Sequence, residues 1–173
     1  MSCLRRDGPG QNKRRLKMGT QSQTYIYDDG SKKKRKNCLV NMYRQMDGYP
    51  TGHGLELITF LQDKRMCNGI TSPEDKFFNG DGCLAASIVA HFKTDQGGIY
   101  LFPPTVGPDG MLDYIYEIYT EKEDIIIECY SLSGGFNPVT SELEDKYLKK
   151  KLVFKGTANE LALIDLGKLE GEL

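Results

Sequence analysis

Cysteine and histidine, the residues that build disulfide frameworks and metal centres, are scarce in this sequence. The 173 residues include five cysteines, an odd number, with wide spacing and no CxxC pair. They are Cys3, Cys38, Cys67, Cys83 and Cys129. This spacing argues against a disulfide framework and against a zinc site, and only His53 and His91 are present to complete a metal site. We therefore expect no metal, no cofactor and a reducing, intracellular compartment.

Long hydrophobic runs are also missing. The N-terminus has no apolar segment of the roughly 7 to 15 residues that a secretory signal requires. The longest apolar stretch, residues 84–92, is broken by Ser87 and His91, and it is far shorter than the roughly 20 residues that span a bilayer. We therefore expect a cytoplasmic protein that does not insert into a membrane.

The chain as a whole lacks an excess of one charge, but its two parts differ. The net charge is −1, whereas residues 1–44 hold 12 basic and 3 acidic residues (+9) and the remainder holds 11 and 21 (−10). A basic arm of this kind is one signal for nucleic-acid binding. However, no aromatic residues are interleaved with the basic ones, and the pI of 6.1 lacks the basic excess of a dedicated nucleic-acid domain. Nucleic acid is therefore a disfavoured partner.

Five consecutive basic residues begin with Lys32 and end with Lys36, and they match the loose pattern of a nuclear import signal. They lie at the tip of a predicted hairpin, where lysines also prevent strands from pairing edge to edge. Nuclear import in a eukaryotic host therefore stands beside a simpler interpretation of these residues as a solvated tip.

The rest of the composition is ordinary for a folded domain. Charged residues make up 27% and aromatic residues 10% of the chain, which argues against disorder throughout. Residues 1–17 combine six basic residues with Gly, Pro and Gln and show no periodicity. We therefore predict a disordered basic arm over residues 1–17 and a single domain over residues 18–173.

Runs of β-prone residues are separated by turn residues along much of the chain. The predicted strands cover residues 23–27, 38–43, 99–102, 113–119, 124–130 and 151–155. Two hairpins are predicted, one from residues 23–27 and 38–43 and the other from residues 113–119 and 124–130. The second hairpin carries apolar side chains on both faces, so we expect it near the centre of the sheet.

Helical periodicity and capping signals account for most of the remaining segments. The predicted helices cover residues 52–65, 72–78, 83–92, 141–149 and 157–164. The third of these is apolar nearly all round, so we expect it to be a buried helix. We therefore predict an α+β fold, with an antiparallel sheet of about five to six strands and two main helices packed on one face.

The stretch between the second strand and the first main helix is the strongest candidate for a binding site. Residues 48–54 hold four glycines or prolines interleaved with Tyr49, Thr51 and His53, and Asp47 precedes them. This composition predicts a tight turn. The free N–H groups at the start of the following helix favour an anion, with Arg44 as a forked donor and Tyr49 as a stacking surface.

A second glycine-rich loop, residues 79–82, carries Asn79 and Asp81 and precedes the apolar helix. If the two helices lie side by side in the same direction, their N-termini form one site for an anionic or nucleotide-like molecule. Neither loop has the spacing of a known phosphate-binding fingerprint. A well-made turn without a ligand, or a surface for a protein partner, therefore remains an alternative.

Cys83 is the candidate nucleophile because the start of a helix favours a thiolate. His53 would act as its base with Asp47 or Asp81 to orient the ring, whereas His91 lies eight residues along the same helix, about 12 Å away. The competing interpretation is a small buried cysteine in a core helix. Glu117 and Glu128 lie within apolar strands, and we expect them to pair with Lys or Tyr across the hairpin rather than to act as a catalytic pair.

Three segments carry a resemblance. They are Met18-Gly19-Thr20-Gln21-Ser22, the turn DGYPTGHG from Asp47 to Gly54, and NGDGCLAA from Asn79 to Ala86 followed by His91-Phe92-Lys93. Together they resemble a group of small uncharacterised proteins of bacteria, phages and large viruses. The resemblance covers roughly residues 18–119 and implies Met18 as a natural start and a viral or microbial origin. No settled activity belongs to that group, so the resemblance assigns no functional residue.

These features predict a non-enzymatic binding module. It recognises an anionic or nucleotide-like small molecule, or a protein partner, through residues 44–54 and 79–83. One alternative is a Cys83-dependent hydrolase or transferase. The other is a nucleic-acid-associated protein that uses the basic arm and the hairpin tip.

Overall fold

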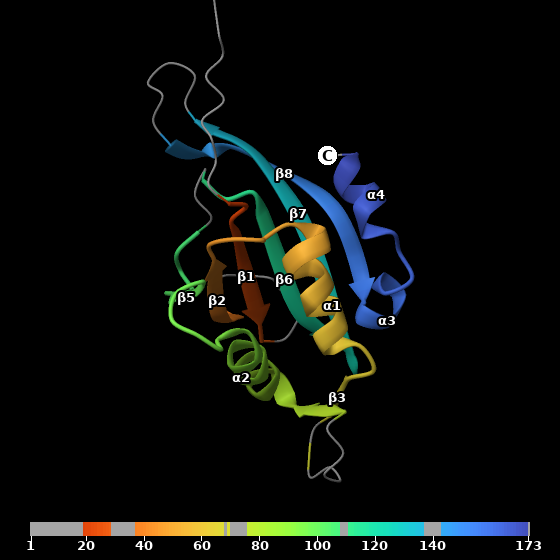
Figure 1. The fold of residues 1–173 in the computed structure, drawn as a ribbon. Helices are drawn as coiled ribbons and strands as arrows, with labels where there is room; N and C mark the ends of the chain where they lie inside the picture. Colours follow the sequence, from red (N-terminus) through yellow and green to blue (C-terminus); the bar gives the residue numbers. More distant parts are fainter. Residues whose placement is uncertain are drawn as a thin grey trace, which may run out of the picture.

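A six-stranded mixed sheet forms the centre of the computed structural model, which describes residues 19–28, 37–67, 69, 76–107, 111–136 and 143–172 (Figure 1). The strands are β1 (Ser22–Tyr27), β2 (Cys38–Arg44), β3 (Arg65–Cys67), β4 (Phe77–Asn79), β5 (Ile99–Phe102), β6 (Tyr114–Glu121), β7 (Asp124–Phe136) and β8 (Leu143–Thr157). The helices are α1 (Leu55–Leu61), α2 (Gly80–Phe92), α3 (Ala158–Leu161) and α4 (Leu166–Gly171), and a π-helical turn, η2 (Pro50–Gly54), leads into α1.

The strand order of the main sheet is β5-β2-β1-β6-β7-β8, and β3 and β4 form a separate parallel pair. Both predicted hairpins are confirmed, since β1 pairs with β2 and β6 with β7 in antiparallel register. The predicted α+β fold with a sheet of five to six strands is confirmed. The sheet is mixed rather than antiparallel, because β6 lies parallel to β1, with Ser22 opposite Tyr114. Turn residues report only on neighbouring strands, so this long-range pairing left no signal in the sequence.

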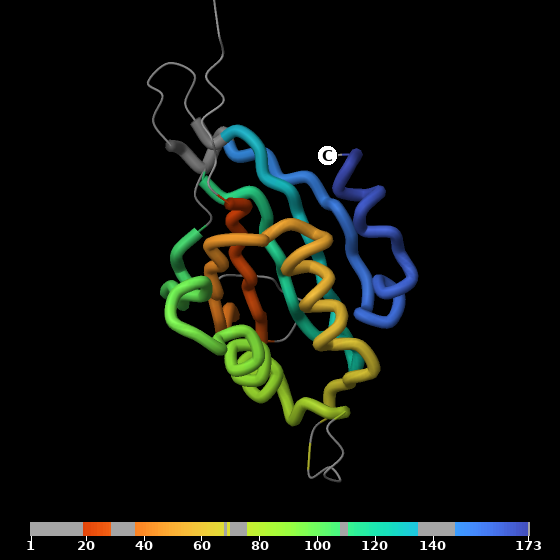
Figure 2. The backbone as a smooth tube through the Cα atoms, viewed as in Figure 1, coloured from red at the N-terminus to blue at the C-terminus, as the bar shows by residue number. Residues whose placement is uncertain are grey.

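The helices α1 and α2 both cover one face of the sheet, as predicted (Figures 1 and 2). Leu57, Ile58 and Leu61 of α1 form one wall of the core, and Leu84, Ala85 and Ile88 of α2 form another. Alternate strand residues such as Ile26 and Ile118 meet them from the sheet and are fully buried. The sheet and the two helices therefore enclose one continuous core.

The opposite face of β6, β7 and β8 carries a buried polar cluster. Glu117 and Glu128 lie directly opposite each other across the hairpin. Lys150 Nζ lies 2.6 Å from Glu117 Oε1, and Lys155 Nζ lies 3.2 Å from Glu128 Oε1. Tyr119 donates its hydroxyl to Glu128 at 2.6 Å. The predicted pairing across the hairpin is confirmed for Glu128 with Tyr119. The lysine partners of both acids come instead from β8, which lies outside that hairpin. These contacts compensate the burial of the two acids.

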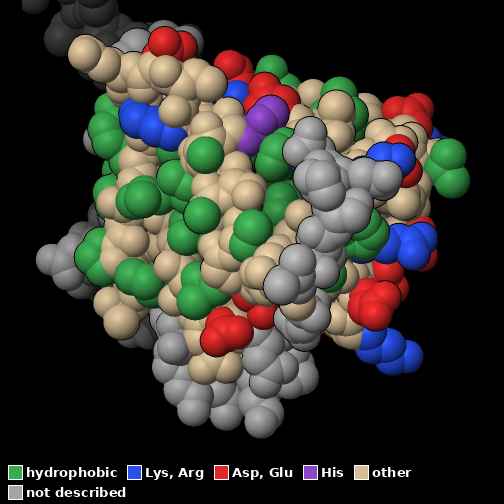
Figure 3. All heavy atoms as spheres, turned by 90° about the horizontal axis from the view of Figure 1, so that it is seen from below, with side chains coloured by type: hydrophobic (Ala, Val, Ile, Leu, Met, Phe, Trp, Pro, Cys, Tyr) green, Lys and Arg blue, Asp and Glu red, His purple; other side chains and the backbone are tan. Residues whose placement is uncertain are grey.

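Three helix predictions are wrong in part. The end of the segment predicted over residues 72–78 is a strand, because Phe78 is buried opposite Met66 in the β3–β4 pair, while residues 72–75 lie outside the described residues. In the segment predicted as a helix over residues 141–149, residues 143–149 are instead the first half of β8, and residues 141–142 lie outside the described residues. There the chain pairs with the long β7, and its lysines suit an edge strand. The predicted buried helix, α2, is buried along one side only, and hydrophobic side chains are exposed on the face of the molecule that Figure 3 shows.

The C-terminal segment follows its capping signals. Thr157 and Glu160 form the predicted capping box at the start of α3. That helix ends at Leu161 rather than at Ile164, and Asp165 then caps α4, whose Leu166 enters the core. No helix in the described part of the chain is long and apolar enough to cross a membrane.

Candidate functional site

The turn between β2 and α1 is closely packed against the start of β1. Asp47 has a left-handed backbone, with φ of 57°. A Cβ atom on Gly48 would lie 2.8 Å from the backbone nitrogen of Ser22, and one on Gly52 would lie 2.6 Å from the carbonyl oxygen of Asp47. Glycine is therefore required at both positions by close approach of the backbone.

The π-helical turn η2 places His53 inside the molecule. The predicted helix start at Gly52 is two residues late, because the helical turn begins at Pro50. The His53 side chain is completely buried, and its ring meets the rings of Tyr116 and Phe92 edge to face at centroid distances of 5.1 and 5.0 Å. This histidine thus joins the turn to the sheet and to the end of α2.

Two polar contacts define the protonation of His53. Arg44 Nη1 lies 3.0 Å from Nδ1 of the ring, and Thr24 Oγ1 lies 2.8 Å from Nε2. A guanidinium can only donate, so Nδ1 accepts and the proton of the neutral ring is on Nε2, where it is donated to Thr24. Burial, assisted by the charge of Arg44, lowers the pKa of His53 to about 4, although Glu56 opposes the shift.

The guanidinium of Arg44 is occupied by groups of the protein itself. Its Nε donates to the carbonyl oxygen of Met46 at 2.8 Å, and its Nη2 donates to Glu56 Oε1 at 3.3 Å. Nη1 contacts both His53 and the second carboxylate oxygen of Glu56. Neighbouring His53 and then Arg44 hold the pKa of Glu56 at about 2, against the opposing effect of partial burial. Glu56 therefore neutralises the predicted anion donor.

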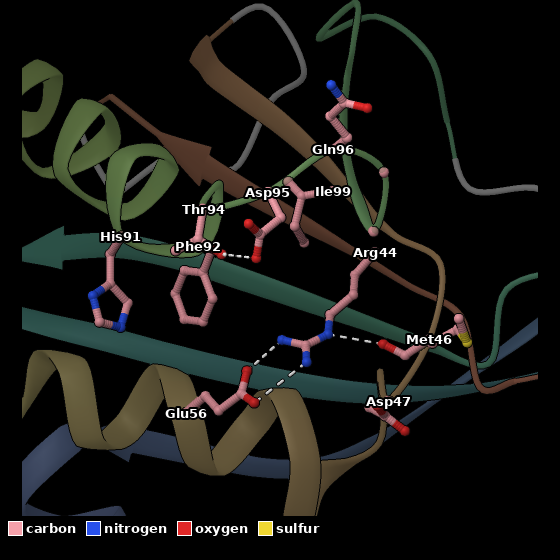
Figure 4. A pocket seen from close by; sticks show the side chains of 12 residues that line it. Arg44, Met46, Asp47, Glu56, His91, Phe92, Thr94, Asp95, Gln96 and Ile99 are labelled. Carbon is pink, nitrogen blue, oxygen red and sulfur yellow. Dashed lines mark hydrogen bonds and ion pairs between the residues drawn. The ribbon is translucent and has the colours of Figure 1, made fainter.

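A hollow of about 450 Å³ lies beside this ion pair (Figure 4). It is enclosed by the end of β2, the first turn of α1, the last turn of α2 and the loop before β5. Its acidic and arginine lining residues are Arg44, Asp47, Glu56 and Asp95, whose formal charges sum to −2, and Phe92 supplies an aromatic wall. In Figure 4 the Arg44 side chain lies between Glu56 and the loop that carries Asp95. The hollow is therefore acidic overall.

A second hollow of about 540 Å³ shares Glu56 and His91 with the first. It is lined mainly by apolar surface from Leu55, Phe60 and the stem of Lys64. The His91 ring stacks on Phe60 with centroids 4.1 Å apart, and Lys64 Nζ lies 4.0 Å from the centre of the Phe60 ring on α1. His91 lies in the last turn of α2.

Two residues of the predicted site have other partners. Thr51 donates its backbone N–H at 3.1 Å and its hydroxyl at 2.8 Å to one carboxylate oxygen of Glu170 on α4. The position expected to attract an anion at the start of the helix thus holds a carboxylate of the same chain. Tyr49 packs over the turn itself, where its ring would lie 2.9 Å from a Cβ on Gly52.

The second predicted loop lies at the other end of the sheet. Asp81 accepts a hydrogen bond from Thr120, near the end of β6. Arg44 lies level with the beginning of β6, because Ser22 of β1 is opposite both Arg44 and Tyr114. Tyr114 and Thr120 are six residues apart along the strand, which corresponds to about 20 Å. Asn79, which accepts from the Gly69 N–H at 3.3 Å, belongs to that distant end. The structure therefore does not bring the two helix starts together.

Cys83 is exposed in the first turn of α2, so its interpretation as a buried core residue is wrong. It belongs to the same distant end as Asp81, and its proposed base, His53, is buried at the opposite end. The two side chains that define the predicted nucleophile and base are thus separated. Asp47, by contrast, does line the hollow beside Arg44.

Sequence reasoning identified Arg44, Asp47 and His53 but missed Glu56, Phe92 and Asp95. Glu56 left a weak signal as an acidic residue in the first turn of the predicted helix. Phe92 and Asp95 left none, because they reach the hollow only through the packing of α2 against α1. In the described residues, no group of three or more His, Cys, Asp or Glu side chains is arranged to hold a metal ion.

Comparisons with known proteins leave the site to be interpreted from its geometry. No protein-family model, curated protein or solved structure matches this chain.

Proposed function

We propose that this protein is a non-enzymatic binding module that holds a positively charged, hydrogen-bond-donating group in the acidic hollow. The observation that carries this proposal is the occupation of the Arg44 guanidinium by Met46, His53 and Glu56. The carboxylates of Asp47 and Asp95 line the same hollow and accept hydrogen bonds only. An amine or guanidinium group complements both the charge and the donor pattern of this surface.

The competing ligand class is an anionic or nucleotide-like molecule, which remains a prediction from the sequence. Two observations weigh against it. The Arg44 cation faces Glu56, and the N–H group of Thr51 faces Glu170. An anion would have to displace a carboxylate of the protein and also approach a lining with a net charge of −2.

The Cys83 hydrolase is the less favoured alternative, because Cys83 lies in the first turn of α2 whereas the buried His53 contacts Phe92 at the end of that helix, nine residues or about 13 Å further along. A nucleic-acid role depends on residues 1–17 and 32–36, which lie outside the described residues. It also stays a prediction from the sequence.

Amide NMR spectra recorded during titration with N-acetylarginine amide test the proposal. The expected result is a saturable shift, in the millimolar range, of the backbone amides of Asp95, Gly97 and Gly98, with no shift of these signals by inorganic phosphate. The variant Asp95→Asn should weaken binding about two- to fivefold, the range for one exposed ion pair. The matched variant Asp124→Asn, at an exposed acid at the start of β7, should leave it unchanged.

A reversed preference, with phosphate and not the guanidinium shifting these amides, would overturn the proposal in favour of the anionic ligand. An absence of shifts with both compounds would overturn it as well.

A further inference from the structure

The acidic hollow and the apolar hollow form one bipartite surface along α1. Glu56 and His91 line both of them. On one side of this shared wall lie Asp95 and Phe92, and on the other side lie Leu55 and Phe60. A ligand that binds in both hollows contacts carboxylates in the acidic hollow and apolar side chains in the other. The surface therefore favours a ligand with a basic group next to an apolar one.

We propose that the occupant is an extended peptide segment of a partner protein, with a basic residue and an apolar residue two positions apart. This inference rests on the proposed function, because the basic side chain fills the acidic hollow. The apolar side chain covers Leu55, whose surface is 48% exposed, and the Phe60–His91 stack. Burial of such an exposed aliphatic side chain is a favourable contribution to association.

The spacing of the two residues follows from the geometry of α1. Glu56 and Phe60 are four residues apart, which corresponds to about 6 Å along the helix axis. In an extended peptide, the side chains of residues i and i+2 point the same way and lie about 6.6 Å apart. A basic residue, any residue and an apolar residue therefore match the two hollows in turn.

The nearby sheet edge is less suited to hold this segment. β5 is the edge strand beside β2, and Lys93 Nζ already contacts the carbonyl oxygens of Gly97 and Ile99 at 2.9 Å each. Pro103 follows the strand directly. A lysine over the backbone and a proline at the end of the strand both oppose addition of another strand, so recognition falls to the side chains of the two hollows.

The basic arm of the chain itself is the alternative occupant that must be distinguished. Residues 14–16 read Arg-Arg-Leu, which has the proposed spacing. Gly19 lies beside Met46, a lining residue of the acidic hollow, since a Cβ on Gly19 would be 3.1 Å from Met46 Cγ. A full-length variant with Arg14→Gln and Arg15→Gln removes this competition without shortening the protein.

Blocked tripeptides titrated against the full-length protein test the inference. The probes are Ac-Arg-Gly-Leu-NH₂ and the reversed Ac-Leu-Gly-Arg-NH₂, and the controls are Ac-Arg-Gly-Gly-NH₂ and Ac-Glu-Gly-Leu-NH₂. One of the two probes should bind about tenfold more tightly than either control, and its NMR shifts should extend from Gly97 to Thr59. Leu55→Ser should abolish the tenfold gain, whereas Leu163→Ser, at a side chain that is 89% exposed, should preserve it.

Each other outcome is decisive. If N-acetylarginine amide binds but neither probe exceeds Ac-Arg-Gly-Gly-NH₂, the peptide inference fails and the proposed function stands. If Ac-Glu-Gly-Leu-NH₂ binds as tightly as the probes, or if no compound binds, both fail. If Arg14→Gln with Arg15→Gln tightens probe binding tenfold or more, the arm is the natural occupant, and the proposal of a partner protein is overturned.

Discussion

At the scale of single residues, His53 illustrates how a residue suited to catalysis serves a structural purpose. Its contacts with Thr24 and Arg44 resemble those of a catalytic histidine, but both His53 and Thr24 are inaccessible to solvent. The ring instead orients Arg44, whose guanidinium then binds Glu56 at the rim of the hollow. The neutral form of the ring is therefore part of the folded structure.

The low pKa of His53 predicts a loss of stability in mild acid. In the unfolded chain this ring has its ordinary pKa of 6.5 and gains a proton as the pH falls below that value. In the folded chain the ring gains a proton only near pH 4. Stability is thus complete above pH 6.5 and declines as the pH falls toward 4. The free energy of unfolding should be about 2 kcal/mol lower at pH 5 than at pH 7, as measured by urea denaturation.

The effects of His53 and Glu56 on stability fall in different pH ranges. The pKa of Glu56 is lowered to about 2 from an ordinary value of 4.5, so its own contribution is lost mainly at lower pH. Nitrogen-15 NMR of the His53 ring should show the Nε2–H tautomer from pH 7 to pH 5. A ring that gains its proton within this interval would contradict the assignment.

At the scale of elements, the turn before α1 tolerates no added atoms at its first glycine. Gly48→Ala would place a methyl group 2.8 Å from the Ser22 backbone and should lower the free energy of unfolding by about 2–3 kcal/mol. Gly82→Ala is the matched control, since no atom of the described residues lies within 4 Å of its Cβ position in α2. That change should raise stability by up to about 1 kcal/mol. Equal effects of the two variants in thermal denaturation would show that the turn can relax.

Local signals in the sequence predicted the elements whose ends are encoded locally. The hairpins β1–β2 and β6–β7 and the capping box at Thr157 are of this kind. The Ser-Pro signal at residues 72–73 predicts a helix that runs through Phe78, but the pairing of β4 with β3 determines the conformation of this segment. The start of β8 is likewise a strand rather than the predicted helix, because its conformation depends on pairing with β7.

The residues of the candidate site likewise fall into those with a local signal in the sequence and those placed by tertiary packing. Arg44, Asp47 and His53 belong to one turn and were identified because that turn is dense in glycine and proline. Phe92 and Asp95 come from a segment some forty residues later and approach Arg44 only through tertiary packing. The charge of the hollow could not be predicted either, because it depends on Glu56 neutralising Arg44.

At the scale of the whole molecule, the C-terminal helix α4 is bound to the turn before α1. Glu170 accepts two hydrogen bonds from Thr51, and Leu166 is buried in the core. Glu170→Gln removes the charge from these contacts and should lower the free energy of unfolding by about 1 kcal/mol. Hydrogen exchange of the Thr51 amide should also become several times faster.

Glu172→Gln is the matched control on the same segment, because in the described part of the chain it is the backbone oxygen of Glu172, and not its carboxylate, that contacts Lys151. It should leave both stability and the exchange of the Thr51 amide unchanged. Equal acceleration by the two variants would mean that α4 is retained by its apolar contacts alone.

The parallel pairing of β1 with β6 also determines when the protein can fold during its synthesis. Ser22 emerges early, but its partner Tyr114 follows only after α1, α2 and β5 have been made. At roughly 5–20 residues per second, the ribosome needs about 5–20 seconds to cover that interval. Throughout it, the apolar side chains of β1 and β2 have no sheet interior to enter, so the nascent chain should be a substrate for chaperones that shield exposed strands.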